Sequence, residues 1–174
     1  NIDPIPAHAS SLGAYSYRLL HGPDYSLVKY SATHCFDFVK GMQQLVKIFL
    51  TEGCPTPLKK LLTEVKHITD HEAFRLITAH NKAADVAIPQ LLQLAHFILY
   101  KYKANMQSLL NMHAQLDAWY GMALAVKKYK LSFPVFTVSD QPFIETKGLY
   151  HLLLQDAVSY DVSLNRQTNF LFLT

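Results

Sequence analysis

The sequence has little cysteine, little excess charge and no long apolar run. Its two cysteines, Cys35 and Cys54, form neither a CxxC pair nor a disulfide framework, and such scarcity favours a reducing compartment. The net charge is only +3 and no run of lysine or arginine exceeds two residues, so composition neither requires nor excludes a nucleic-acid-binding face. The densest apolar run, residues 91–100, is interrupted by Gln93 and His96 and is too short to cross a bilayer. Because no basic-then-apolar signal peptide opens the sequence, we expect a cytoplasmic protein with no membrane partner.

The familiar catalytic motifs are missing as well. The sequence contains no GxGxxG, no GxSxG, no HExxH and no complete phosphate-binding loop. We therefore expect the chain itself to have no enzyme activity, no catalytic residues, no metal and no cofactor.

What the sequence does contain is a long apolar helical pattern between Ile88 and Lys130. Half of the 174 residues are hydrophobic and 17% are charged, which is typical of a chain with a substantial core. Alternate steps of four and three define a set of positions, called the seam here, with the 3.5-residue repeat of a packed helix. The seam consists of Leu91, Ala95, Ile98, Tyr102, Asn105, Leu109, Met112, Leu116, Trp119, Ala123 and Val126, which are all apolar or aromatic except Asn105.

The ends of this segment also carry helix signals. Pro89 suits a first helical turn, Lys127 and Lys128 suit the negative end of the helix dipole, and Pro134 prevents continuation. At 1.5 Å per residue, one continuous helix here would be roughly 60–65 Å long. A rod of that length is typical of an element that bridges distant parts of a molecule.

Shorter helical patterns precede the seam. We expect a first helix from Ser10 or Ser11 to Leu20, a stop and restart at 21–24, and a long second helix over about 25–51. A third helix is expected over 57–66, followed by one or two short helical turns between 67 and 86. The expected apolar faces are Leu12, Tyr15 and Leu19 in the first helix; Leu27, Val28, Ser31, Ala32, Cys35, Phe38, Val39, Met42, Leu45, Val46 and Phe49 in the second; and Leu58, Leu61, Leu62 and Val65 in the third.

The pattern after Lys130 is β-like. Residues 135–138, 141–145 and 160–164 are candidate strands, and 169–174 is apolar enough for a central strand covered on both faces. The sequence thus predicts a mainly α fold, a long-helix bundle with a few short β-strands at its C-terminal end. The expected division is a helical domain over 1–131 and a short β segment over 132–174.

Two histidines, His67 and His71, have the i, i+4 spacing of a metal half-site. No third and fourth ligands accompany them, and solvated surface histidines are the favoured interpretation. His34 and Cys35 are adjacent and so point to different faces of a helix, which favours an inert core thiol over a nucleophile.

Three polar or aromatic features lie inside the long helical pattern. Asp117 has no partner carboxylate, so a buried or interfacial hydrogen bond is favoured. Asn105 is interpreted as a residue that fixes register or as a place where the seam becomes exposed. The aromatic residues Phe97, Tyr100, Tyr102, Trp119 and Tyr120 favour core packing over a cofactor cage.

The C-terminal third resembles a specific family on three segments. Leu116-Asp117-Ala118, followed by 123–126 and 129–134, is similar to an "LD…A…A…Y…P" pattern. Residues 148–153 resemble a "G-x-x-H-P-L" element in which Leu152 replaces the proline, and 162–164 with 170–174 resemble a strand pair that leads into a Walker A loop. Residues 50–53 are similar to a segment of a short, Bacteroidetes-type branch of the same family. The family is that of the MutS-like DNA mismatch-repair ATPases, and the likeness covers most of the chain from about residue 36.

The resemblance implies a helical core and lever whose P-loop ATPase domain would follow Thr174. The full-length protein would then bind ATP and Mg²⁺, act on DNA and form a homodimer, whereas this segment would hydrolyse nothing. By position, Ala157 and Val158 would lie at the edge of the adenine pocket. The DNA-gripping clamp of full-length MutS has no counterpart between Lys66 and Ile88.

An alternative hypothesis assigns the chain to a different class of protein. The chain could be a free-standing helical bundle that binds a small ligand or dimerises through its long helix.

Overall fold

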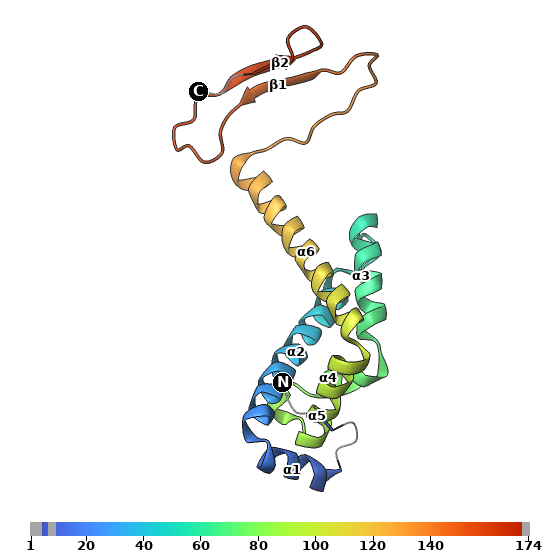
Figure 1. The fold of residues 1–174 in the computed structure, drawn as a ribbon. Coiled ribbons are helices and arrows are strands. Elements are labelled where there is room, and N and C mark those ends of the chain that lie inside the picture. Colours follow the sequence, from blue (N-terminus) through green and yellow to red (C-terminus); the bar gives the residue numbers. More distant parts are fainter. Residues whose placement is uncertain (1–4, 7–9, 172–174) are drawn as a thin grey trace. The chain divides into compact units, whose positions relative to one another are not determined.

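The computed structural model describes residues 5–6 and 10–171, which divide into two compact units. The first unit ends at Ala118 and the second begins at Trp119, inside the last helix. The first unit is helical and the second contains the end of that helix and a β-hairpin (Figure 1). A mainly α fold with short C-terminal strands is thereby confirmed. The sequence-based division into a helical domain and a β segment was placed after residue 131, further along the chain than the division between these two units.

Two helices open the first unit. Helix α1 (Ser11–Leu20) is capped by the Ser10 hydroxyl oxygen, which accepts a hydrogen bond of 3.1 Å from the Gly13 N–H. Helix α2 (Gly22–Phe49) restarts after a single non-helical residue, His21, with Pro23 in its first turn. The first helix is confirmed, and the second begins at Gly22 and ends at Phe49 where about 25–51 was predicted.

The buried face of α1 differs from the predicted one. Ala14 and Tyr17 are buried, whereas Leu12 and Leu19 are each 84% exposed and Tyr15 is exposed as well. Apolar residues occur on both sides of this ten-residue helix, so periodicity alone could not select the face that packs. The small Ala14 lies on the packed side, where α1 contacts α2 and α5 (Ile88–His96).

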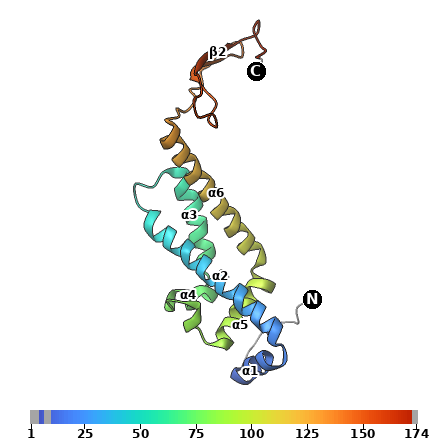
Figure 2. The same cartoon turned by 90° about the vertical axis from the view of Figure 1, so that its left-hand side faces the viewer.

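Helices α2 and α3 form the main packed pair, seen side by side in Figure 2. The buried residues of α2 recur at steps of three and four: Tyr25, Val28, Ala32, Phe36, Val39, Met42 and Val46. Phe36 is fully buried although it was missing from the predicted face, and Phe49 is exposed although it was included. Helix α3 (Thr56–Thr69) buries Leu61, Leu62, Val65 and Ile68, close to the prediction.

The next segment forms three short helical pieces, where one or two short helical turns were predicted. They are η1 (Glu72–Phe74), α4 (Arg75–Ala79) and η2 (Ala83–Asp85). The Lys40 ammonium of α2 donates hydrogen bonds to the His80 and Asn81 carbonyl oxygens, where α4 has ended. This contact holds the segment against α2 across forty residues of sequence.

The long continuous helix predicted over Ile88–Lys130 is wrong. Helix α5 ends at His96, a π-helical segment η3 (Phe97–Lys101) follows, and α6 (Lys103–Tyr129) begins after the non-helical Tyr102. The wide turn is closed by a 2.9 Å hydrogen bond from the Tyr102 N–H to the Phe97 carbonyl oxygen. The seam nevertheless packs as far as Leu116, and its member Leu109 is buried together with Met106, which lies outside the seam. Its later member Trp119 is exposed.

The second unit contains one hairpin. Strands β1 (Ile144–Leu149) and β2 (Tyr160–Leu164) pair antiparallel with Ile144 opposite Leu164. The register shifts between Thr146 and Leu149, where Gly148 has a positive φ of 65° and its N–H donates to the Asp161 carboxylate at 2.8 Å. Helix α6 ends before Lys130, whose φ is 51°.

The predicted strands are confirmed only where a partner is present. Strand β2 matches the predicted strand 160–164. Strand β1 shares only Ile144 and Glu145 with the predicted strand 141–145. Residues 135–138 and 169–171 are not strands and are exposed, because no third strand pairs with them among the described residues. The rest of the predicted central strand, residues 172–174, lies outside the described residues.

Candidate functional site

Four rings meet where the first unit changes from α5 to α6, and we call this cluster the aromatic junction: His71, Phe74, Phe97 and Tyr102. Phe97 stacks on His71 with 4.7 Å between ring centroids and on Tyr102 at 4.8 Å. Phe74 meets Tyr102 edge-on at 5.7 Å. Such offset and edge-on arrangements are the favourable ones for aromatic pairs.

Local structure places each ring of the aromatic junction. The His71 Nδ1 accepts a hydrogen bond of 3.2 Å from the Ala73 N–H and so caps η1, whose last residue is Phe74. The π-helical turn places Phe97 and Tyr102, five residues apart, on one side of the chain. These tertiary contacts explain why a sequence with a regular apolar repeat abandons the α-helix at this point.

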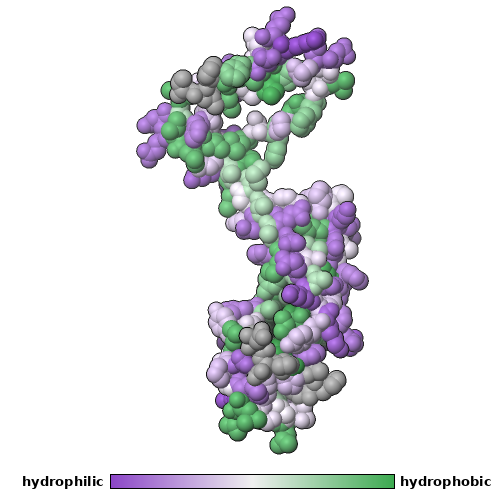
Figure 3. Space-filling model, viewed as in Figure 1, coloured by the Kyte–Doolittle hydropathy of each residue, from purple (hydrophilic) through white to green (hydrophobic). Residues whose placement is uncertain are grey.

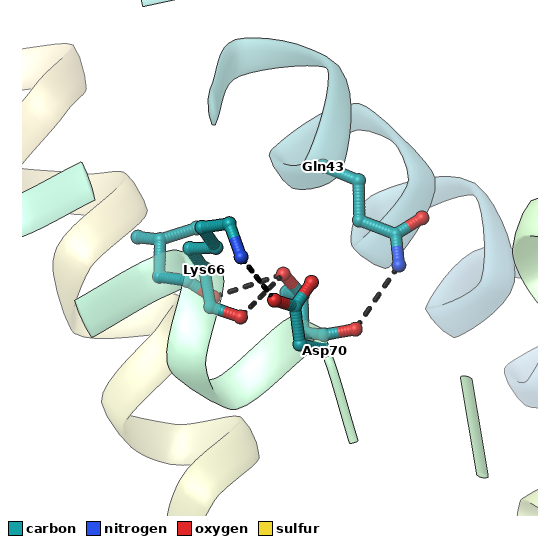
Figure 4. Close-up of polar contacts among 5 residues, drawn as sticks. Gln43, Lys66 and Asp70 are labelled. Atoms are coloured by element: carbon teal, nitrogen blue, oxygen red, sulfur yellow. Dashed lines mark hydrogen bonds and ion pairs between the residues drawn. The ribbon is translucent and has the colours of Figure 1, made fainter. Parts of the chain in front are cut away.

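The end of α3 is tied to two other helices next to the junction. The Tyr102 hydroxyl donates to the Ile68 carbonyl oxygen at 3.1 Å, and the Gln43 amide of α2 donates to the Thr69 carbonyl oxygen at 3.1 Å. These carbonyls belong to the last turn of α3, which has no helical donors for them. Figure 4 shows Gln43 directed at this turn, where Lys66 and Asp70 form an i, i+4 ion pair. The last turn of α3 is therefore connected to α2 through Gln43 and, through Tyr102, to the residue directly before α6.

His67 and His71 do not share a helix face. Helix α3 ends at Thr69, so His67 is exposed on the helix while His71 belongs to the aromatic junction and is half-buried. The prediction of a solvated surface histidine is therefore wrong for His71. Within the described part of the chain, no group of three or more His, Cys, Asp or Glu side chains is arranged to hold a metal ion.

Cys35 and His34 point apart, as predicted. The Cys35 thiol is half-buried on α2, and this burial raises its pKa above the ordinary value of 9.0. His34 is exposed and meets the Tyr30 ring edge-on at 4.3 Å. A protonated thiol without a neighbouring base is a poor nucleophile.

The polar and aromatic residues of the long helical pattern do not form one cluster. Asp117 is exposed, so a buried hydrogen bond is wrong and the interfacial alternative stays a prediction. Asn105 is half-buried. Of the five aromatic residues expected to pack in the core, only Phe97 and Tyr102 join the aromatic junction. The exposed ones are Tyr100, Trp119 and Tyr120.

Ala157 and Val158 lie in the connection between β1 and β2. Ala157 is half-buried and Val158 is 83% exposed. Their role at an adenine pocket stays a prediction from the family resemblance.

The second unit exposes many apolar side chains, which we call the C-terminal apolar surface. It includes Trp119, Tyr120, Met122 and Leu124 of α6 and Phe133, Val135, Phe136, Val138, Phe143, Ile144, Leu149, Leu152, Leu153, Leu154, Val158, Tyr160, Phe170 and Leu171 beyond it. Figure 3 shows hydrophobic residues over this unit, interspersed with hydrophilic ones. Val162 is the buried hydrophobic residue of the hairpin. Contiguous exposed apolar patches are typical of interaction surfaces.

Sequence reasoning missed the aromatic junction as a unit. Tyr102 was expected to pack in the seam, but its hydroxyl bond to Ile68 and the contacts of its ring with His71 depend on the folded arrangement. Spacing gave no sign of the π-helical turn, since the apolar repeat continues through it.

The comparisons with known proteins give no relatives: no family model, no curated protein and no solved structure matches the chain. Among the described residues, no helix is both long enough and apolar enough to span a membrane.

Proposed function

We propose that this chain is the helical core and lever segment of a MutS-like DNA mismatch-repair ATPase. It couples ATP binding in a separate P-loop domain to the binding of DNA or of a protein partner. ATP and Mg²⁺ are held by that other domain, with Ala157 and Val158 at the edge of the adenine pocket, and the whole protein works as a homodimer.

The C-terminal apolar surface is the observation that carries this proposal. A two-stranded hairpin is marginal in water by itself, and a helix end that is apolar all round belongs inside a larger assembly. Both features are found in the second unit, around the segments that resemble the joint between lever and ATPase domain.

The long helices support the mechanical part of the proposal. Helices α2 and α6 contain 28 and 27 residues, or about 40 Å each at 1.5 Å per residue. The aromatic junction ties α6 to α3, and Gln43 ties α3 to α2, so a displacement of α6 is passed to its neighbours through fixed contacts. A rigid element of this kind transmits a change only between parts that each have two arrangements.

The test is the parent coding sequence beyond Thr174 together with an ATPase assay. We expect a G-x-x-x-x-G-K-[ST] loop to follow, ATP hydrolysis by the extended protein, and none by the present chain. Loss of hydrolysis when the loop lysine is replaced by alanine would assign the activity to that domain.

Two results would contradict the proposal. One is a natural stop codon directly after Thr174, which would favour a free-standing bundle. The other is tight, sequence-selective DNA binding by the present chain alone.

A further inference from the structure

A concavity of about 570 Å³ lies where α1 ends and α2 begins. Arg18 contributes from α1, and Tyr25, Ser26, Lys29, Tyr30 and Thr33 contribute from the first turns of α2. Ser26, Lys29 and Thr33 follow one another at steps of three and four, so they form one row along the helix. The concavity is within the first unit and is independent of the aromatic junction.

The two cations of the concavity, Arg18 and Lys29, form no ion pair with any residue that the structure describes. The Arg18 guanidinium lies over the Tyr25 ring, 5.7 Å from its centroid, which fixes the flat face of the guanidinium. Across the described residues, neither Arg18 nor Lys29 has a side-chain hydrogen bond or ion pair. The edge of the guanidinium and the ammonium therefore have all their donors available for an anion.

The hydroxyl groups of Ser26 and Thr33 already donate hydrogen bonds within α2. Ser26 donates to the Gly22 carbonyl oxygen and Thr33 to the Lys29 carbonyl oxygen, both at 2.9 Å. Positive charge, and not hydroxyl donors, must then determine what the concavity binds. This favours an anion such as a phosphate group.

The Tyr30 ring extends the recognition beyond charge. It is 65% exposed and is held edge-on by His34 from the next turn of α2. An exposed ring beside two cations is the combination by which proteins bind single-stranded nucleic acid, because the cations follow the backbone and a base stacks on the ring. An acidic peptide would use the cations but not the ring.

We propose that this concavity binds the phosphodiester backbone of single-stranded nucleic acid, with one base stacked on Tyr30. Binding is weak and independent of base sequence, since the concavity offers no buried donor set for base edges. The assignment does not depend on the proposed function, because it concerns the present chain without any ATPase domain.

The experiment measures fluorescence anisotropy of a labelled thymidine oligonucleotide with the present chain. With two phosphate contacts, affinity is expected to fall about sevenfold between 50 and 200 mM salt. The double variant Arg18→Gln/Lys29→Gln is expected to lose at least fivefold in affinity at 50 mM salt and most of the salt dependence. Tyr30→Ala is expected to lose at least fivefold while it keeps the salt dependence.

The matched control is Lys59→Gln/Lys60→Gln, which removes the same charge from exposed positions on α3. It should stay within twofold of the unmodified chain, with circular dichroism used to show that every variant is folded. The proposal is overturned if no binding occurs at 50 mM salt or if the control loses as much affinity as the Arg18 and Lys29 variant. Equal competition by polyglutamate at matched charge would also overturn it, in favour of an acidic peptide.

Discussion

A single hydroxyl group connects the start of α6 to the end of α3. The Tyr102 ring contacts both Phe97 and His71, and its hydroxyl group donates to the Ile68 carbonyl oxygen, which has no donor within its own helix. The ring packs against its aromatic neighbours, and the hydroxyl group forms the hydrogen bond to the end of α3. A substitution that removes only the oxygen therefore separates the two contributions.

Tyr102→Phe should lower the free energy of unfolding by about 1 kcal/mol, because the ring stays while the half-buried Ile68 carbonyl loses its partner. Urea denaturation followed by circular dichroism measures the change. Tyr120→Phe is the control, since Tyr120 is exposed and no hydrogen bond of its hydroxyl is found among the described residues. Equal effects of the two substitutions would show that the bond to Ile68 contributes nothing.

Cys35 gives a prediction on pH. Burial raises the pKa of this thiol above 9.0, so the folded chain keeps its proton at a pH where the unfolded chain has lost it. The contribution of the thiol to stability is full below pH 9.0 and is lost as pH rises above that value. In a Cys54→Ser variant, the alkylation rate of Cys35 by iodoacetamide should reach half its maximum at a higher pH in the native state than in concentrated urea. Identical midpoints would contradict this.

At the scale of whole elements, the sequence predicts what local signals determine. Ser10, Pro23 and Pro89 mark helix starts that the structure confirms, and the buried residues of α3 follow its apolar repeat. The break at 97–102 could not be predicted, because its cause is the contact of Phe97 and Tyr102 with His71, which is distant in sequence. The aromatic junction was missed for the same reason.

Strand formation also depended on contacts that the sequence pattern does not reveal. Residues 135–138 have the composition of a strand but lie exposed without a pairing partner among the described residues, whereas 160–164 pairs with β1. Strand propensity describes how a segment fits a sheet, and a sheet is formed only where a partner is present. The face of α1 that packs was likewise decided by its neighbours.

Helix α6 has two parts that differ in packing, and amide hydrogen exchange should distinguish them. Met106 and Leu109 are buried and Met112 and Leu116 pack on the core, whereas the side chains from Trp119 to Leu124 are exposed. Local opening costs least where few apolar contacts are lost. Amides of 106–116 should therefore exchange markedly more slowly than those of 119–126, with the buried part of α2 as the protected reference. Uniform protection along α6 would contradict this.

For the molecule as a whole, the contrast between the two units is the main result. The first unit has a continuous buried core that includes Phe36, Phe74 and Leu109, whereas the second consists of a helix end, a hairpin and loops with little buried apolar area. The first has the packing of an independent fold, and the second has the exposed apolar side chains on which the proposed function rests.

The exposed segment after α6 provides the test at this scale. Val135 and Phe136 are 87% and 92% exposed, so the chain alone should self-associate at micromolar concentrations and bind the dye ANS. The double variant Val135→Lys/Phe136→Lys should reduce both signals in sedimentation and fluorescence measurements, while the unfolding of the first unit is unchanged. Ser132→Lys/Thr137→Lys adds the same charge at exposed polar positions of the same segment and removes no apolar surface. If this control reduces association equally, charge repulsion and not apolar contact governs association, and the C-terminal apolar surface loses its role as an interface.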